Sequence, residues 1–233
     1  MNLIELGDLK FYVRYGTSDE KSIREVVGRN VYQRKNFKID SGELWADLGG
    51  NIGAFGILAA KLGAHVIAFE PFKESYDIYK ENVRLNGLEN QIELFNLAVV
   101  GNGQKIAQMG VSKTGNFWRN SLIKTPAAKK EKVFVNCIKF EEAVISVDGC
   151  KMDIEGSEFE ILSDLNRFKK IKKMVYEHSF DINPSLILYK KIIEGLRCIY
   201  ENVLFKKLPD NFEYWQNSWF PPCANIFCFG LKV

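Results

Sequence analysis

A glycine-rich turn between an apolar strand and a helical stretch is the feature that most restricts how this chain can fold. Leu44 to Leu48 is an apolar run of strand length, and the glycines within Gly49 to Gly53 mark a tight turn. Ala54 to Leu62 then has the pattern of a helix, and His65 to Phe69 is a second apolar run. A strand, a crossover helix and another strand form the unit from which parallel sheets are built.

The same unit is repeated once, and strands and helices continue to alternate after it. Tyr76 to Asn86 carries apolar residues at helical spacing among charges, and Gln91 to Phe95 follows as a third strand. Further strands are expected at Val133 to Ile138, Ser146 to Met152, Met174 to Tyr176, Ile199 to Phe205 and Ile226 to Leu231, with helices near Glu158 to Asp164 and Ser185 to Gly195. This order predicts an α/β fold with a doubly wound, Rossmann-like sheet.

The length of 233 residues suits one large α/β domain, and the sequence contains no linker or internal repeat. We therefore expect a single domain over residues 1–233, with an N-terminal approach segment at 1–43 and the Rossmann-like core at 44–233. Within the approach segment, Phe11 to Tyr15 and Asn30 to Phe37 are rich in strand-forming residues.

Charge and cysteine content exclude several classes of protein. The formal net charge is only +3, which gives no argument for nucleic acid as a partner. No run approaches the roughly 20 apolar residues of a membrane span, and the first residues include Glu5 and Asp8, unlike a signal peptide. The five cysteines form no C-x-x-C pair, so we expect reduced thiols and a cytoplasmic protein.

The residues at the strand ends indicate a nucleoside site, because doubly wound sheets bind ligands beyond the carboxyl ends of their strands. Asp47 precedes the glycine-rich turn, where a ligand can approach the backbone and the N-terminus of a helix. Glu70 ends the next strand, where its carboxylate can accept hydrogen bonds from two ribose hydroxyls. The turn lacks the G-x-G-x-x-G spacing of dinucleotide folds, which disfavours a nicotinamide enzyme. The alternatives are a turn packed for structural reasons and a helix-capping Glu70.

Four motifs resemble those of the FkbM family of S-adenosylmethionine-dependent methyltransferases. They are Trp45 to Gly53, Phe69-Glu70-Pro71, Glu81 to Asn86 and Lys151 to Glu158, in order within about Val31 to Ser179. The resemblance implies a seven-stranded class I methyltransferase sheet with its last strand antiparallel. It also implies S-adenosylmethionine as cofactor and O-methylation, often of a sugar hydroxyl. Gly50 stands where the family usually has alanine, which loosens the turn without removing a contact group.

The family motifs also imply which residues bind the cofactor. The implied set is Asp47, Gly49, Gly50, Asn51, Gly53, Glu70, Pro71, Asn96, Leu97, Ala98 and Asp153. In the family pattern, Asp153 faces the methyl group and the step from Glu155 to the next glycine shapes the pocket. Glu155 and Glu158 also fit a structural role, since acids are favourable in the first turn of a helix.

His178 ends the strand that follows Asp153 in the predicted sheet, and is one of only two histidines. We expect its imidazole to lie over the same face as Asp153 and to act as general base, because a sugar hydroxyl is a poor nucleophile. The catalytic residues expected are then His178, Asp153 and Glu155; a purely structural histidine is the alternative. Asp153, Glu155 and Glu177 also offer oxygen ligands for a divalent metal, which the sequence leaves open.

The acceptor is expected to be a sugar or glycan, bound by a polar and aromatic loop containing Asn116, Trp118 and Asn120. A second aromatic cluster at Tyr214 to Phe220 is either a further sugar-stacking wall or core. A ribose 2′-O-methyltransferase acting on RNA is the rival enzyme, and it should show paired catalytic lysines around the strand-end aspartate. A cofactor-binding module without activity is the rival from another class. The oligomeric state is left open.

Overall fold

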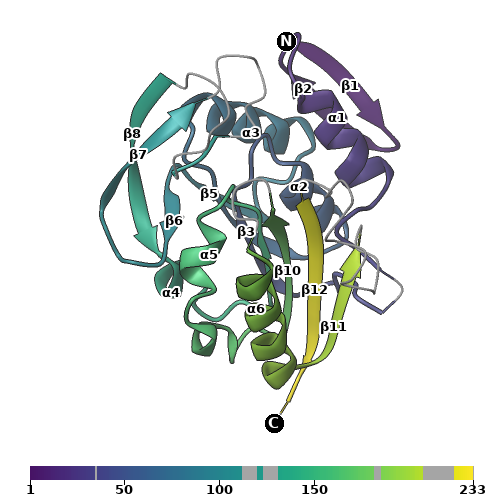
Figure 1. Ribbon diagram of the computed structural model, residues 1–233. Coiled ribbons are helices and arrows are strands. Elements are labelled where there is room, and N and C mark those ends of the chain that lie inside the picture. Colours follow the sequence, from purple (N-terminus) through teal and green to yellow (C-terminus); the bar gives the residue numbers. More distant parts are fainter. Residues whose placement is uncertain (35, 112–119, 123–130, 181–184, 207–222, 233) are drawn as a thin grey trace, which may run out of the picture.

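A sheet of seven strands forms the centre of the computed structural model, which describes residues 1–34, 36–111, 120–122, 131–180, 185–206 and 223–232 (Figure 1). The strands, in spatial order, are β11 (Tyr200–Lys206), β12 (Cys223–Leu231), β10 (Lys173–Ser179), β9 (Gly149–Met152), β3 (Leu44–Leu48), β4 (His65–Phe69) and β5 (Ile92–Phe95). β12 runs antiparallel to both of its neighbours, whereas β10, β9, β3, β4 and β5 are parallel. The predicted class I sheet with an antiparallel last strand is confirmed.

Helices cover both faces of this sheet, because its strands are apolar on both sides. The helices are α2 (Ala54–Lys61) and α3 (Lys73–Leu85) on one face, with α5 (Glu158–Ile161) and α6 (Leu186–Ile199) on the other. Neighbouring strand residues alternate between the two hydrophobic clusters: Trp45 belongs to the cluster that contains Ile57 of α2, and Ala46 to the cluster that contains Leu196 of α6. Figure 1 shows α5 and α6 on the face turned toward the viewer.

A separate sheet of three strands lies beside the main one (Figure 1). Its members are β6 (Ala98–Val100), β7 (Ile106–Val111) and β8 (Glu131–Lys139), and the short helix α4 (Phe140–Ala143) follows. The strand expected at Val133 to Ile138 therefore exists, but it does not belong to the main sheet. Phe134 on its outer face is 77% exposed while Val135 is buried, as in a sheet covered on one face only.

The N-terminal segment forms a hairpin and a helical stretch. Its elements are β1 (Asn2–Leu6), β2 (Leu9–Val13), α1 (Asp19–Ile23) and the π-helix η1 (Arg24–Gly28). Phe11 and Val13 share a hydrophobic cluster with Trp45 of the main sheet. Asn30 to Phe37 forms no strand in its described residues, only an isolated bridge between Arg34 and Phe37, which corrects the expectation of a β-rich stretch there. Among the described residues, no helix is long and apolar enough to cross a membrane.

Candidate active site

A cavity lies at the carboxyl ends of the central strands, at the point where the chain order reverses between β3 and β9. Its wall combines the turn after β3, the ends of β4, β9 and β10, the start of β6, and residues of the N-terminal segment. The expected cofactor residues that line it are Gly49, Gly50, Asn51, Glu70, Pro71, Leu97, Ala98 and Asp153. The structure thus brings most of the predicted cofactor set to one cavity.

The glycine-rich turn is held against two neighbouring elements. Gly49 has a φ of 77°, and a Cβ there would lie 1.9 Å from the carbonyl oxygen of Asp153. Gly53 has a φ of 97°, and a Cβ there would lie 2.3 Å from the ring of Tyr79 on α3. Both positions require glycine for the close approach as well as for the backbone conformation. Gly53 itself does not line the cavity, so its expected direct role becomes one of packing.

Asp47 lies underneath this turn and is fully buried, outside the lining of the cavity. Its Oδ2 accepts a hydrogen bond of 3.2 Å from Tyr79, and its Oδ1 lies 3.2 Å from Nζ of Lys151. Lys151 also donates to the carbonyl oxygens of Leu48 and Gly49, at 3.3 and 2.7 Å. The expectation that Asp47 meets the ligand is therefore corrected. Its carboxylate is paired with Lys151 and accepts a hydrogen bond from Tyr79, and these contacts stabilise the turn.

Burial lowers the pKa of Lys151, but the attraction of Asp47 and Asp153 outweighs it, and the net pKa is raised above the usual value. Lys151 therefore stays a cation at neutral pH. A buried ammonium that is already paired with Asp47 and with backbone carbonyls is a structural brace of the turn.

Glu70 ends β4 with its carboxylate held in place by the backbone. Oε2 accepts from the amide of Asn51 at 2.7 Å, and Oε1 accepts from the amide of Phe72 at 2.8 Å. Burial raises the pKa of Glu70 to about 7, although both amides act in the opposite direction. Asn96 does not line the cavity; its side chain donates to the carbonyl oxygens of Glu70 and Pro71, at 2.8 and 2.9 Å. Asn96 was expected to contact the cofactor, but its side chain instead supports the end of β4.

Three carboxylates from the ends of β9 and β10 meet in the cavity. Asp153, Glu155 and Glu177 each place an oxygen within 4.8 Å of the others, and all three line the cavity. Glu155 has a φ of 51°, a left-handed conformation uncommon for a residue other than glycine. Carboxylate oxygens at this spacing can coordinate a divalent cation, and they can also accept hydrogen bonds from the hydroxyl groups of a ligand.

His178 does not belong to this group, which corrects the expectation of a histidine base. The side chain is fully buried among the rings of Phe159, Phe180 and Tyr189, outside the lining of the cavity. Neither ring nitrogen has a hydrogen-bond partner among the described residues. Burial lowers the pKa of His178 to about 4, so the imidazole is neutral at pH 7.

Sequence reasoning missed several side chains that line the cavity, among them Tyr32 and Lys151, and it considered Glu177 only as a metal ligand. Tyr32 comes from the N-terminal segment, and its hydroxyl donates to Oδ2 of Asp153 at 2.9 Å. The alternation of side chains along β10 could have identified Glu177. Tyr176 and His178 lie on one face of the sheet, so residue 177 between them lies on the opposite face. Nothing in the sequence linked Tyr32 to Asp153.

The candidate acceptor loop is described only in part. Asn120 lines the cavity, and the neighbouring Ser121 donates to the carbonyl oxygen of Glu155. Asn116 and Trp118 lie outside the described residues, as does the aromatic cluster at Tyr214 to Phe220.

Comparison with known proteins gives one family and several similar folds. Residues 47–194 match the Methyltransferase FkbM domain. The structure of an FkbM methyltransferase from Methylobacillus flagellatus is similar with a TM-score of 0.54 at 17% identity, covering 85% of this chain and 47% of that one. A Pyrococcus abyssi tRNA (uracil-54, C5)-methyltransferase, solved with S-adenosyl-L-homocysteine, has a TM-score of 0.49 at 14% identity and covers 97% and 43%. A precorrin-6Y C5,15-methyltransferase from Geobacter metallireducens has a TM-score of 0.48 at 13% identity and covers 94% of each chain.

This chain thus spans about half the length of the first two structures. No curated protein matches the sequence. The matched span is more than half of the chain, and it contains the glycine-rich turn, Glu70 and the carboxylates at the ends of β9 and β10. This chain belongs to the FkbM family of methyltransferases.

Proposed function

We propose that this chain transfers the methyl group of S-adenosylmethionine to a hydroxyl oxygen of a sugar or glycan. The observation that carries the proposal is a single cavity that joins the glycine-rich turn and Glu70 to the carboxylates Asp153, Glu155 and Glu177. Family membership supports the transfer of a methyl group. The choice of acceptor rests on the chemistry of the cavity wall.

We place the cofactor against the turn after β3 and the end of β4. Each oxygen of Glu70 receives one backbone amide and retains a lone pair, so an ionised Glu70 can accept hydrogen bonds from the two ribose hydroxyls. Leu97 and Ala98 line the same cavity and would lie beside the adenine. Asp153 would then lie near the positively charged sulfur, where a carboxylate is electrostatically favourable.

In the proposed reaction, the bond from the methyl carbon to sulfur breaks as a bond to the acceptor oxygen forms. The sulfonium becomes a neutral thioether, and the hydroxyl loses its proton. Because His178 is buried elsewhere, we assign the proton to a carboxylate in the cavity, Asp153 or its neighbour Glu177. The methyl group is already activated, so the main task of the cavity is to hold the hydroxyl in line with it.

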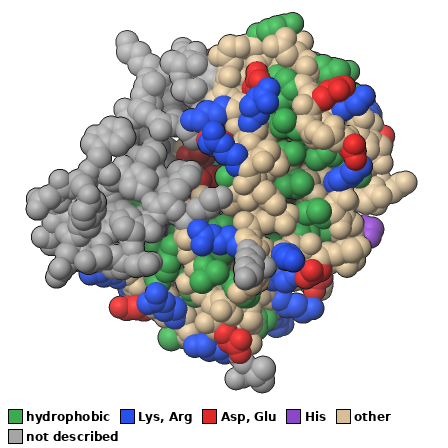
Figure 2. All heavy atoms as spheres, turned by 90° about the vertical axis from the view of Figure 1, so that its right-hand side faces the viewer, with side chains coloured by type: hydrophobic (Ala, Val, Ile, Leu, Met, Phe, Trp, Pro, Cys, Tyr) green, Lys and Arg blue, Asp and Glu red, His purple; other side chains and the backbone are tan. Residues whose placement is uncertain are grey.

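The acidic wall favours a neutral acceptor with many hydroxyls. Carboxylates accept hydrogen bonds from hydroxyls and repel phosphates. Two lysines, Lys21 and Lys151, line the cavity, and Lys151 is already paired with Asp47. On the face shown in Figure 2, the described Lys and Arg side chains are interspersed with Asp and Glu. These features support a sugar over RNA. We also propose one domain and a cytoplasmic location, consistent with the free thiols of Cys137, Cys150, Cys198 and Cys228.

The proposal is tested by offering radiolabelled cofactor with a panel of sugars and glycosides, a structured RNA and a protein extract. We expect label in a carbohydrate only. Label in the RNA alone, with binding that weakens steeply as salt rises, would instead establish the ribose alternative. Cofactor binding with no transfer to any fraction would favour the inactive module. Parallel reactions with EDTA test whether the three carboxylates bind a cation. A rate of methyl transfer that falls with the chelator indicates a bound cation, and an unchanged rate indicates that the carboxylates contact the acceptor hydroxyls directly.

A further inference from the structure

We propose that Tyr32 is a positioning residue that holds the carboxylate of Asp153 toward the sulfur of the cofactor. The inference rests on the proposed function, because it assumes that S-adenosylmethionine occupies the cavity. Tyr32 lies outside residues 47–194, the span that matches the family. The site would therefore be completed by the N-terminal segment.

The contact between the two residues is direct. The hydroxyl of Tyr32 donates to Oδ2 of Asp153 at 2.9 Å, across 121 residues of sequence. Both residues line the cavity, and Tyr32 is only 5% exposed. Such a hydrogen bond restricts rotation of the carboxylate, because it fixes one of the two oxygens.

Tyr32 is itself held firmly. Its ring packs edge to face against Phe55 of α2, with ring centroids 5.6 Å apart. Burial, together with the negative charge of Asp153, raises the pKa of Tyr32 well above its usual value. The phenol therefore stays protonated and remains a donor throughout the neutral range.

Lys151 exerts an electrostatic pull on the same carboxylate. Its ammonium lies 5.9 Å from the centre of the Tyr32 ring and is attracted electrostatically by Asp153. Without the hydrogen bond from the phenol, this attraction would turn the carboxylate toward Lys151. Asp153 would then lose part of its interaction with a cation in the cavity.

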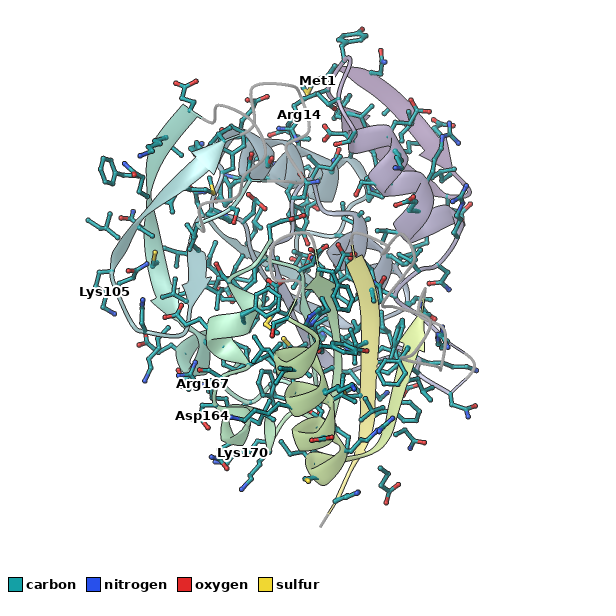
Figure 3. The ribbon with its side chains drawn as sticks, in the orientation of Figure 1. Met1, Arg14, Lys105, Asp164, Arg167 and Lys170 are labelled. Carbon is teal, nitrogen blue, oxygen red and sulfur yellow. The ribbon has the colours of Figure 1, made fainter. Side chains whose placement is uncertain are left out.

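The segment that carries Tyr32 is anchored at a second point of the site. Arg14, at the end of the hairpin, forms a buried ion pair with Asp19 at 2.8 Å, and its Nη2 lies 3.5 Å from Oδ1 of Asn51 in the glycine-rich turn. Figure 3 shows Arg14 beside the N-terminal elements, far from Lys170 at the other end of the molecule. The N-terminal segment thus contacts the turn through Arg14 and the carboxylates through Tyr32.

The experiment compares two ligands that differ in charge, S-adenosylmethionine and S-adenosylhomocysteine, by calorimetry. The intact native chain, Tyr32→Phe and Tyr15→Phe are titrated with each ligand. Tyr15 is a matched control, because it belongs to the same segment and is 68% exposed. The ratio of the two dissociation constants reports the carboxylate near the sulfur, whereas general damage to the site weakens both ligands equally.

We expect the native chain and Tyr15→Phe to prefer the cationic ligand. Tyr32→Phe should lose about fivefold to tenfold of this preference while its affinity for S-adenosylhomocysteine stays within about twofold, since the neutral ligand does not depend on the carboxylate. An unchanged ratio in Tyr32→Phe, or no preference in the native chain, would overturn the inference and leave the cofactor site standing. Absence of binding of either ligand to the native chain would contradict the proposed function itself.

Discussion

Single residues on β10 decide which groups reach the cavity. Glu177 lines it, whereas its neighbour His178 points to the opposite face and packs among aromatic rings. The sequence allowed residues to be placed at strand ends, and Glu70 and Asp153 both line the cavity at that edge of the sheet. Which face a side chain takes depends on register, and a shift of one residue reverses it. The histidine was therefore placed at the correct end but on the wrong face.

The burial of His178 predicts a dependence of stability on pH. Its pKa is about 4 in the folded chain against 6.5 for the free side chain, so the unfolded chain binds more protons between these values. The free energy of unfolding should fall as the pH drops through this window, by roughly 2 kcal/mol between pH 7 and pH 5 from this residue. His178→Leu should remove that part of the slope, as measured by urea unfolding at both pH values.

His65→Gln is the control, because His65 lies exposed at the start of β4. It should retain the native slope. If His178→Leu kept the full native dependence on pH, the account of a buried neutral imidazole would be wrong. Methyl transfer by His178→Leu at pH 8 should stay near the native rate, since the side chain does not line the cavity.

At the scale of elements, α3 connects the N-terminal hairpin to the glycine-rich turn. Asn82 on α3 accepts from the amide of Tyr12 at 2.6 Å, and its side-chain amide donates to the carbonyl oxygens of Tyr12 and Ile52, at 3.2 and 2.9 Å. The side chain is fully buried. One residue therefore satisfies polar groups of β2 and of the turn that precedes α2.

Asn82→Ala should lower the free energy of unfolding by about 2 to 3 kcal/mol, because it leaves buried backbone groups without partners. Asn90→Ala is the matched control at an exposed position and should lie within about 0.5 kcal/mol of the native chain. Urea unfolding at one pH compares the three proteins. Equal midpoints for Asn82→Ala and Asn90→Ala would refute the linking role of α3.

The elements that were predictable are those with a strong local pattern. The glycine-rich turn and the apolar runs of β3 and β4 specify strand, turn and helix without help from distant residues. The strand near Val133 was expected, but the separate sheet to which it belongs was not, because its partners β6 and β7 are chosen by tertiary pairing. Asn30 to Phe37 is rich in strand formers, yet Tyr32 and Phe37 are buried as single side chains in the core.

At the scale of the whole molecule, the cavity gathers segments that are far apart in sequence. The family motifs identified the part contributed by the main sheet, because each motif ends a parallel strand and these ends share one edge. The part contributed by residues 18–32 could not be predicted, since it depends on how the N-terminal segment packs over that edge. Phe11 and Val13 share a hydrophobic cluster with the sheet, which supports the proposal of one domain.

The proposed function depends on binding of S-adenosylmethionine beside the glycine-rich turn and Glu70. Titration calorimetry at pH 8, where Glu70 is ionised given its pKa of about 7, should show one site in the native chain. Glu70→Ala should weaken binding by about tenfold to a hundredfold, the scale of hydrogen bonds to a charged group. Glu89→Ala, an exposed acid beyond α3, should bind as the native chain does. No binding by the native chain, or equal affinity in Glu70→Ala, would contradict the account.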